Sequence, residues 1–174
     1  MSTDPTIVRY RIIESPVGRL LLAATDEGLV RVAFESEGFD AVLTDLAKKL
    51  GSEPVEDADA LTRAADELAE YFAGERREFD LPLDRRLSTG FRTTVHTFLP
   101  NIPYGHTMSY GDVAGNVQNR RAIRAVGSAC ARNPLPIVVP CHRVVRADRS
   151  LGGYLGGLEV KAALLELEGV RLPV

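Results

Sequence analysis

Residues 135–144 read Leu-Pro-Ile-Val-Val-Pro-Cys-His-Arg-Val, and this stretch decides how the second half of the chain is built around Cys141. Prolines and β-branched residues stiffen the backbone, so the thiol is expected on a firmly held, buried segment. A nucleophile has to be held in this way to meet its target in line. The alternative is a buried cysteine that only packs, the usual role of a free thiol. His142 and Arg143 follow directly and favour the nucleophile.

A base for the thiol is expected nearby, because the thiolate and not the thiol attacks carbon. Adjacent side chains on an extended segment point to opposite faces, so a direct contact between Cys141 and His142 is awkward. A bent backbone or a relay through an ordered water would be needed to join them. A carboxylate that orients the histidine is expected in the amphipathic helix over residues 159–168, where Glu168 is the first choice and Glu166 the alternative.

Upstream of the cysteine, the pattern predicts two helices joined by a polar turn. Ser109 and Asp112 fit a capping box for a short helix over residues 110–115. A second helix is predicted over residues 120–132 and ends at Asn133, which precedes a proline. Helix, turn and helix describe a helix-turn-helix, although many helical hairpins of this spacing bind nothing.

The second of these helices carries small residues on one side, and Arg124 is its single candidate for a long side chain that enters a bound partner. A smooth helix can approach a narrow groove closely, and one long cation can then enter the base stack. Tight helix packing is the alternative role for the small residues, and Cys130 among them is assigned to packing. The glycine-rich stretch 149–157 can bring its backbone and Tyr154 close to a flat ligand.

Charge is divided unevenly along the chain. Residues 1–86 hold 11 Lys/Arg and 19 Asp/Glu, whereas residues 87–174 hold 10 and 5. A polyanionic partner for the second half is one interpretation, and a solvated basic face is the other. Two cysteines and three histidines without paired-ligand spacing argue against a metal site and a disulfide framework. No signal peptide or apolar run of membrane-spanning length is found, so no membrane partner is expected.

The first half reads as a structural domain, an antiparallel meander followed by helices. The predicted elements are strands over residues 7–14, 20–24, 29–34 and 79–83, helices over residues 41–50 and 61–72, and a polar loop over residues 51–59. A seam is expected near residues 84–90, where Ser88 or Thr89 can cap a helix that runs to Phe98.

The motifs of the second half together resemble the O6-alkylguanine-DNA alkyltransferase family, the methylated-DNA–protein-cysteine methyltransferases. The resemblance spans residues 90–169, with its motifs in family order and spacing. These motifs are Pro140-Cys-His-Arg-Val, Asn133-Pro, Gly156-Gly, Ile102-Pro-Tyr-Gly, Ser109-Tyr, Arg124-Ala-Val-Gly and Leu164-Leu-Glu-Leu-Glu-Gly. The first half matches the family only in layout.

The resemblance implies an α+β fold with two domains. Residues 1–86 would form an N-terminal RNase H-like domain of a small β-sheet and helices, and residues 87–174 a C-terminal helical domain with a winged helix-turn-helix. It implies a DNA repair protein that binds double-stranded DNA through the minor groove and flips O6-alkylguanine out of the duplex. The alkyl group would pass irreversibly to Cys141 in a single turnover, without a cofactor. A cytoplasmic monomer is expected, and cooperative assembly on DNA is left open.

The resemblance also implies a role for each residue of the site. Cys141 would attack, His142 would take the thiol proton through water, and Glu168 would orient His142. Tyr110 would donate toward a guanine ring nitrogen, and Asn133 would brace the turn before the cysteine segment. The expected DNA contacts are Arg124, which would fill the gap in the stack, with Arg120, Arg121, Ala125, Gly127 and Ser128, and the expected pocket residues are Pro136, Val144, Tyr154, Leu155 and Gly156.

Two other function classes compete with the suicide alkyltransferase. A damage-sensing binder of the alkyltransferase-like kind recognises the lesion without removing it and lacks the nucleophile, so the presence of Cys141 argues against it. A thiol hydrolase or redox protein is the second competitor. The adjacent Cys-His spacing, the basic second half and the absence of a Cys-x-x-Cys motif argue against that class.

Overall fold

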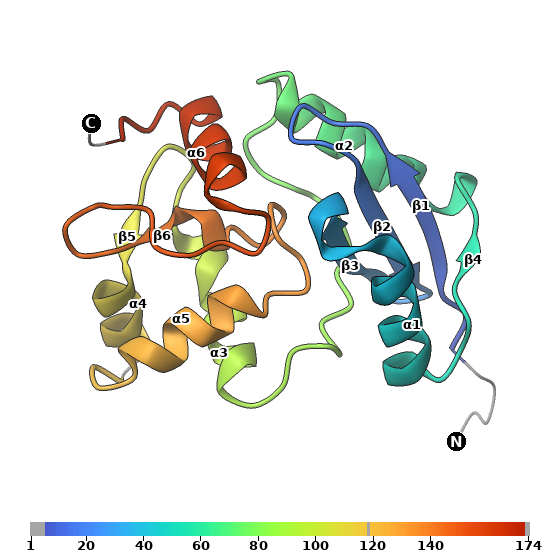
Figure 1. Cartoon of the computed structure of the whole chain (residues 1–174), viewed down its shortest axis with the longest axis horizontal. Helices are drawn as coiled ribbons and strands as arrows, with labels where there is room; N and C mark the ends of the chain where they lie inside the picture. The colour runs from blue at the N-terminus through green and yellow to red at the C-terminus, as the bar shows by residue number, and fades with distance from the viewer. Residues whose placement is uncertain (1–5, 118, 173–174) are drawn as a thin grey trace. The chain divides into compact units, whose positions relative to one another are not determined.

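The computed structural model describes residues 6–117 and 119–172. The chain divides into two compact units, Met1–Leu87 and Ser88–Val174 (Figure 1). Each unit has its own buried apolar residues and is described by itself below. Within the described ranges, none of the helices combines the length and apolar character that a membrane span needs.

The first unit is built on a small sheet with the strand order β3-β2-β1-β4. Its strands are β1 (Arg9–Ile13), β2 (Leu20–Thr25), β3 (Gly28–Phe34) and β4 (Val55–Glu56). The first three form the predicted antiparallel meander. The prediction of a polar loop over residues 51–59 was wrong at β4, which pairs parallel to β1. This pairing uses the backbone, because the Val55 amide donates to the Val8 carbonyl at 2.9 Å while the Val55 side chain stays exposed.

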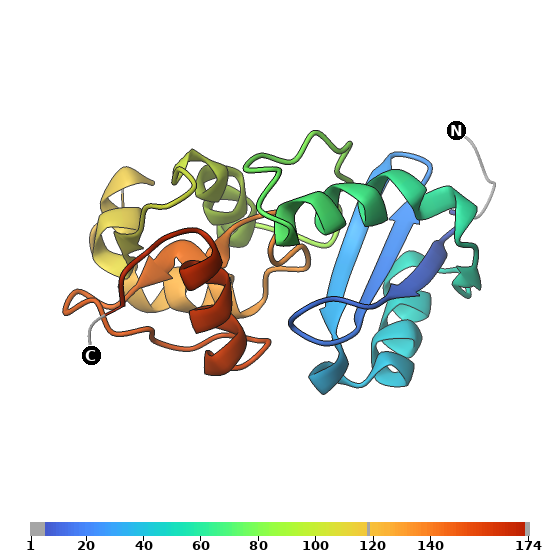
Figure 2. The ribbon, with the colours of Figure 1, turned by 90° about the horizontal axis from the view of Figure 1, so that it is seen from above.

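Two helices cover the opposite faces of this sheet, α1 (Phe39–Leu50) and α2 (Thr62–Phe72) (Figure 2). Both faces of β2 are therefore buried, and residues 20–23 of that strand are fully inaccessible. Leu46 of α1 and Leu68 of α2 are buried in the same way. The helical spacing of apolar residues predicted both helices, because each has one face that must leave water.

The strand predicted over residues 79–83 is absent, and this prediction was wrong. Only an isolated bridge joins Leu29 to Leu83. Pro82 has no amide hydrogen, so it cannot take part in a regular ladder, although its carbonyl accepts from the Leu29 amide at 2.9 Å. Gly28 is required beside it, because a Cβ there would lie 2.4 Å from the Pro82 carbonyl oxygen.

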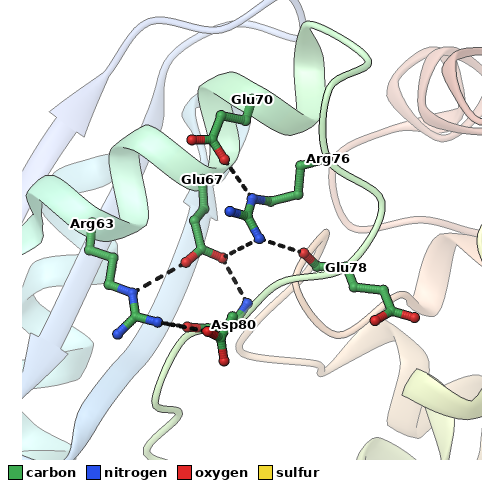
Figure 3. A network of polar contacts seen from close by, with 6 residues as sticks. All are labelled: Arg63, Glu67, Glu70, Arg76, Glu78 and Asp80. Carbon is green, nitrogen blue, oxygen red and sulfur yellow. Dashed lines mark hydrogen bonds and ion pairs between the residues drawn. The ribbon is translucent and has the colours of Figure 1, made fainter.

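A network of charged side chains fixes the segment after α2 instead (Figure 3). Its centre is the buried carboxylate of Glu67, which accepts from the Asp80 amide at 2.7 Å. Arg63 and Arg76 approach the same carboxylate at 3.3 and 3.4 Å. Arg76 also bonds Glu70 at 2.7 Å. The arginines of this network are therefore neutralised inside the first unit.

The second unit is mainly helical. Its elements are α3 (Phe91–Phe98), β5 (Met108–Ser109), α4 (Tyr110–Asn116), α5 (Ile123–Ala131), β6 (Val144–Val145) and α6 (Leu158–Leu167). Helix α5 packs against α3 and α4, and β5 pairs parallel to β6. Single turns of 3-10 helix occur in this unit at Leu99–Asn101 and Cys141–Arg143. The first unit has such turns at Glu35–Glu37 and Asp59–Leu61.

The predicted capping box of α4 is confirmed. The Asp112 amide donates to the Ser109 hydroxyl at 2.9 Å, and the Ser109 amide donates to the Asp112 carboxylate at 3.3 Å. The predicted start of α5 was wrong, because this helix begins at Ile123 and the described residues just before it, 119–122, are not helical. The Ala122 amide donates to the Asn119 carbonyl at 3.0 Å, so these residues form a turn and the helix begins after it.

The cap predicted for α3 was also wrong, because Gly90 and not Ser88 or Thr89 is the N-cap residue. The Ser88 hydroxyl lies 2.7 Å from Nδ1 of the buried His96 instead. The other ring nitrogen lies 2.7 Å from the Ala129 carbonyl of α5. Since a carbonyl only accepts, Nε2 carries the proton and Nδ1 accepts from the serine. The Ser88 hydroxyl therefore makes a side-chain hydrogen bond to His96 and does not cap α3 as predicted.

Candidate active site

The segment around Cys141 is strongly bent, not extended as predicted. Residues 141–143 form one 3-10 turn, in which the Arg143 amide donates to the Pro140 carbonyl at 3.1 Å. A tight turn precedes it, and Ile137 there has a φ of 74°. A β-branched residue rarely adopts this left-handed conformation, so the surrounding packing must hold it. Residues 133–145 are all buried, which supplies that packing.

Asn133 ties this bend together with both ends of its amide group. Its Nδ2 donates to the Val139 carbonyl at 2.8 Å, and its Oδ1 accepts from the Leu135 amide at 3.0 Å. Burial raises the pKa of the Cys141 thiol, and a hydrogen bond from the Asn133 side chain opposes part of this rise. The fully buried amide thus links the end of α5 to the reactive turn.

Three charged or ionisable side chains form a buried cluster behind the cysteine. His142 Nε2 lies 2.7 Å from Glu168 Oε2, at the end of α6. Arg143 donates to Glu168 through Nε at 2.7 Å and through Nη2 at 3.1 Å, and its Nη1 reaches the Ile102 carbonyl at 2.7 Å. Because the carboxylate accepts from Nε2, the Nδ1 nitrogen of His142 is an acceptor. That buried atom has no hydrogen-bond partner among the described residues.

Burial decides the protonation states at neutral pH. It raises the pKa of Cys141 to about 11 and that of Tyr110 to about 12, so both groups keep their protons. It also lowers the pKa of His142 below its ordinary value, which keeps the ring neutral. Burial opposes ionisation of Glu168, but hydrogen bonds from His142 and Arg143 outweigh it and lower that pKa to about 2. The site at rest holds a thiol, a neutral imidazole and a carboxylate.

A cavity of about 420 Å³ opens onto the cysteine. It is lined by Tyr110, Ile123, Gly127, Cys130, Ala131, Cys141, Arg146, Gly152, Gly153, Tyr154 and Leu155. Five of the predicted site residues thus meet at one cavity, from α4, α5, the cysteine turn and the glycine-rich loop. A larger hollow of about 640 Å³ in the first unit is lined by none of the predicted site residues.

Three predicted pocket residues lie outside this lining, namely Pro136, Val144 and Gly156. Pro136 is buried in the turn before the cysteine, and the Val144 carbonyl accepts a hydrogen bond from Lys161. Conversely, Cys130 was assigned to packing and lines the cavity. Burial raises the pKa of its thiol, so it stays protonated and is a weak nucleophile.

Lys161 is the site residue that the sequence prediction missed. Its fully buried ammonium group donates to the carbonyls of Val144 at 2.7 Å and Gly153 at 3.2 Å, and also to that of Leu151. It lies 5.8 Å from the ring centre of Tyr110. Burial lowers the pKa of Lys161 to about 8. The signal was its spacing, because a lysine at position 161 shares the buried face of α6 with residues 164, 165 and 168.

The predicted DNA-contact residues divide into two groups. Arg124, Ala125 and Ser128 are exposed on α5, and Arg120 and Arg121 are exposed on the turn before it rather than on the predicted helix. Gly127 points inward instead, where a Cβ would lie 4.0 Å from the Tyr110 ring. Among residues 6–117 and 119–172, no cluster of three or more His, Cys, Asp or Glu side chains is placed to hold a metal ion.

Comparison with known proteins gives the same assignment for both halves. Residues 90–170 match the family model of the 6-O-methylguanine DNA methyltransferase DNA binding domain, and residues 8–85 match that of its ribonuclease-like domain. The methylated-DNA–protein-cysteine methyltransferase of Methanosarcina acetivorans is 44% identical over 163 residues, which cover 92% of this chain and 97% of that relative. The Mycobacterium tuberculosis relative is 42% identical over 167 residues, 96% of both chains.

Solved structures agree with these sequence matches. The crystal structure of Mycobacterium tuberculosis O6-methylguanine methyltransferase has a TM-score of 0.83 and 42% identity, and covers 97% of this chain and 96% of that one. The crystal structure of Mycobacterium tuberculosis OGT in complex with DNA has a TM-score of 0.80 and 41% identity, and covers 95% and 96%. With both halves matched by family models and relatives above 40% identity along nearly the whole length, the chain belongs to the 6-O-methylguanine DNA methyltransferase family.

Proposed function

We propose that this protein repairs O6-alkylguanine in duplex DNA by transferring the alkyl group to its own Cys141. The observation that carries the proposal is the buried Cys141 thiol at a cavity of about 420 Å³. The neighbouring residue His142 is hydrogen-bonded to Glu168. A sulfur–carbon bond forms as the bond from guanine O6 to the alkyl carbon breaks. The product is a thioether that water does not hydrolyse, so each molecule acts once.

The protonation states give each side chain its part in the transfer. Cys141 starts as a thiol, because burial raises its pKa to about 11. Nδ1 of His142, which has no hydrogen-bond partner among the described residues, accepts the thiol proton through a water molecule, and the Glu168 carboxylate stabilises the imidazolium that results. The Tyr110 hydroxyl, protonated at neutral pH, donates to a ring nitrogen of the departing guanine and offsets its developing charge.

The same proposal assigns DNA binding to α4, α5 and the turn between them. The exposed residues on α5 include Ala125 and Ser128, which are small enough to let the helix approach the minor groove. Arg124 enters the stack in place of the flipped nucleotide. Flipping is required because the reacting atom lies inside the duplex.

Intact-protein mass spectrometry tests the transfer directly. The protein is mixed with an oligonucleotide that contains one O6-methylguanine, beside the variants Cys141→Ala and Cys130→Ala. We expect one added methyl group per chain on the wild type and on Cys130→Ala, and none on Cys141→Ala. The Cys130 variant is the matched control, since its thiol lines the same cavity. Retention of the damaged strand without a change in mass would place the protein among damage binders.

A second test separates base flipping from chemistry. Arg124→Ala is expected to slow methyl transfer from duplex DNA more than transfer from the free base O6-methylguanine, because only the duplex reaction leaves a gap in the stack. Equal slowing of both reactions would remove Arg124 from the flipping role.

A further inference from the structure

Cys130 is a second thiol at the active-site cavity, and the proposed methyl transfer does not use it. It lies near the end of α5 and lines the same cavity of about 420 Å³ as Cys141. The other residues of α5 in this lining are Ile123, Gly127 and Ala131, and none of them carries a reactive group. The Cys130 sulfur is therefore the one group through which α5 can take part in covalent chemistry at the cavity.

A short series of hydrogen bonds fixes the two cysteines relative to each other. The Asn133 amide donates to the Cys130 carbonyl at 3.3 Å, and the Asn133 side chain donates to the Val139 carbonyl at 2.8 Å. The Cys141 amide donates to the same Val139 carbonyl at 2.8 Å. The two thiols also lie within electrostatic range, because the neighbouring Cys141 adds to the effect of burial in raising the pKa of Cys130.

Two thiols at one cavity allow a second reaction when the alkyl group carries a leaving group of its own. A 2-haloethyl group is the simplest case. After its transfer, Cys141 holds a 2-haloethyl thioether, and the thioether sulfur can displace the halide and close a three-membered sulfonium ring. Water opens this ring to a hydroxyethyl thioether, whereas a second thiol opens it to a two-carbon bridge between the sulfurs.

Cys130 is the best nucleophile at the cavity for this second step. The other polar side chains of the lining are those of Tyr110, Arg146 and Tyr154. Phenols and a permanently charged guanidinium are weaker nucleophiles toward carbon than a thiol. Burial keeps Cys130 protonated, which makes it slow toward an ordinary alkyl carbon. A sulfonium ring is a much stronger electrophile, and confinement of both reactants at one cavity raises their effective concentration.

We propose that Cys130 is a second acceptor, which captures alkyl groups that carry a leaving group on their second carbon. In the first step, the bond from guanine O6 to carbon breaks as the bond to the Cys141 sulfur forms. In the second, the Cys130 sulfur bonds to the other carbon, the halide leaves as an anion, and the thiol proton passes to water. The product is an ethylene bridge between the two sulfurs, and no oxidant or reductant takes part. The inference rests on the proposed function, because that reaction delivers the alkyl group to Cys141.

Peptide mapping of the full chain tests the bridge. Trypsin cleaves after Arg124, Arg132 and Arg143, so the two cysteines fall on separate peptides, residues 125–132 and 133–143. The protein is mixed with a duplex that contains one O6-(2-chloroethyl)guanine, used at once because N1 of the same base can also displace the chloride. We expect the wild type to yield these two peptides joined by one ethylene unit. The intact mass should be that of a single chain.

The matched control is the double variant Cys130→Ser and Ser128→Cys. It keeps one thiol on each peptide but moves the first to the exposed side of α5. Cys130→Ala is the second variant. Both should carry a hydroxyethyl group on Cys141 and no bridge, and alkylation of Cys141 shows that each variant is folded.

Two results would overturn the inference while leaving the proposed function intact. One is a wild type with a hydroxyethyl group on Cys141 and a free Cys130. The other is a bridge in the double variant, which would mean that the position of Cys130 at the cavity has no effect. A wild type that takes up no alkyl group, from this duplex or from one with O6-methylguanine, would contradict the proposed function itself.

Discussion

Glu168→Gln is the most informative single substitution, because it keeps the shape of the side chain and removes its charge. Arg143, which is only 6% exposed, would then lie buried without the carboxylate that accepts two of its hydrogen bonds. Removing one partner of a buried ion pair costs about 3–5 kcal/mol. A protein of ordinary stability has about 5–15 kcal/mol in total. We expect a large loss of the free energy of unfolding and a marked fall in alkyl-transfer rate.

Acid provides an independent measure of the same interaction. The folded pKa of Glu168 is about 2, below its ordinary 4.5, so its stabilisation is complete above 4.5 and is lost as pH falls toward 2. A shift of this size corresponds to roughly 3 kcal/mol. This free energy is similar in size to the cost of breaking the buried pair. The free energy of unfolding of the wild type should therefore fall over that pH window. Glu168→Gln lacks the titrating carboxyl group, so it should not show this fall.

The measurement is equilibrium urea unfolding, followed by circular dichroism, at neutral pH and across the acid range. Glu166→Gln is the matched control, because Glu166 is exposed on the same helix and should change stability by less than about 0.5 kcal/mol. A loss below about 1 kcal/mol in Glu168→Gln, the size of an exposed pair, would refute the buried network as the element that holds His142.

The remaining predictions concern the cavity and its base. Lys161→Met should lower the free energy of unfolding by about 1–3 kcal/mol and speed proteolysis of the glycine-rich loop, since buried carbonyls lose their donor. Gly152→Ala should slow transfer from the free base, because a Cβ there would lie 2.8 Å from the Tyr110 hydroxyl at a φ of 73°; an unchanged rate would mean that the ring moves freely. The transfer rate should stay within about twofold between about pH 6.5 and 7.5, because a neutral His142 takes the proton. A rise of about tenfold per pH unit would show that solvent forms the thiolate.

Local patterns were enough for the elements whose side chains carry the signal. Helices α1 and α2 follow from helical spacing, because each buries one face, and strands β1 to β3 follow from short apolar runs between turn residues. The patterns failed where backbone hydrogen bonds alone decide whether a segment pairs with the sheet. Strand β4 joins the sheet through the Val55 amide, and the predicted strand at residues 79–83 is replaced by a single bridge beside Pro82.

The sequence by itself determined the family and gave Cys141 as the candidate nucleophile, because Pro140-Cys-His-Arg-Val and its companion motifs stand in order along the chain. Only the tertiary structure decided how the site works. It bends the cysteine segment, buries His142 with no partner for Nδ1 among the described residues, and bonds Lys161 to carbonyls of the glycine-rich loop. Burial and hydrogen bonds between residues far apart in sequence set these protonation states and positions, and no local pattern records either of them.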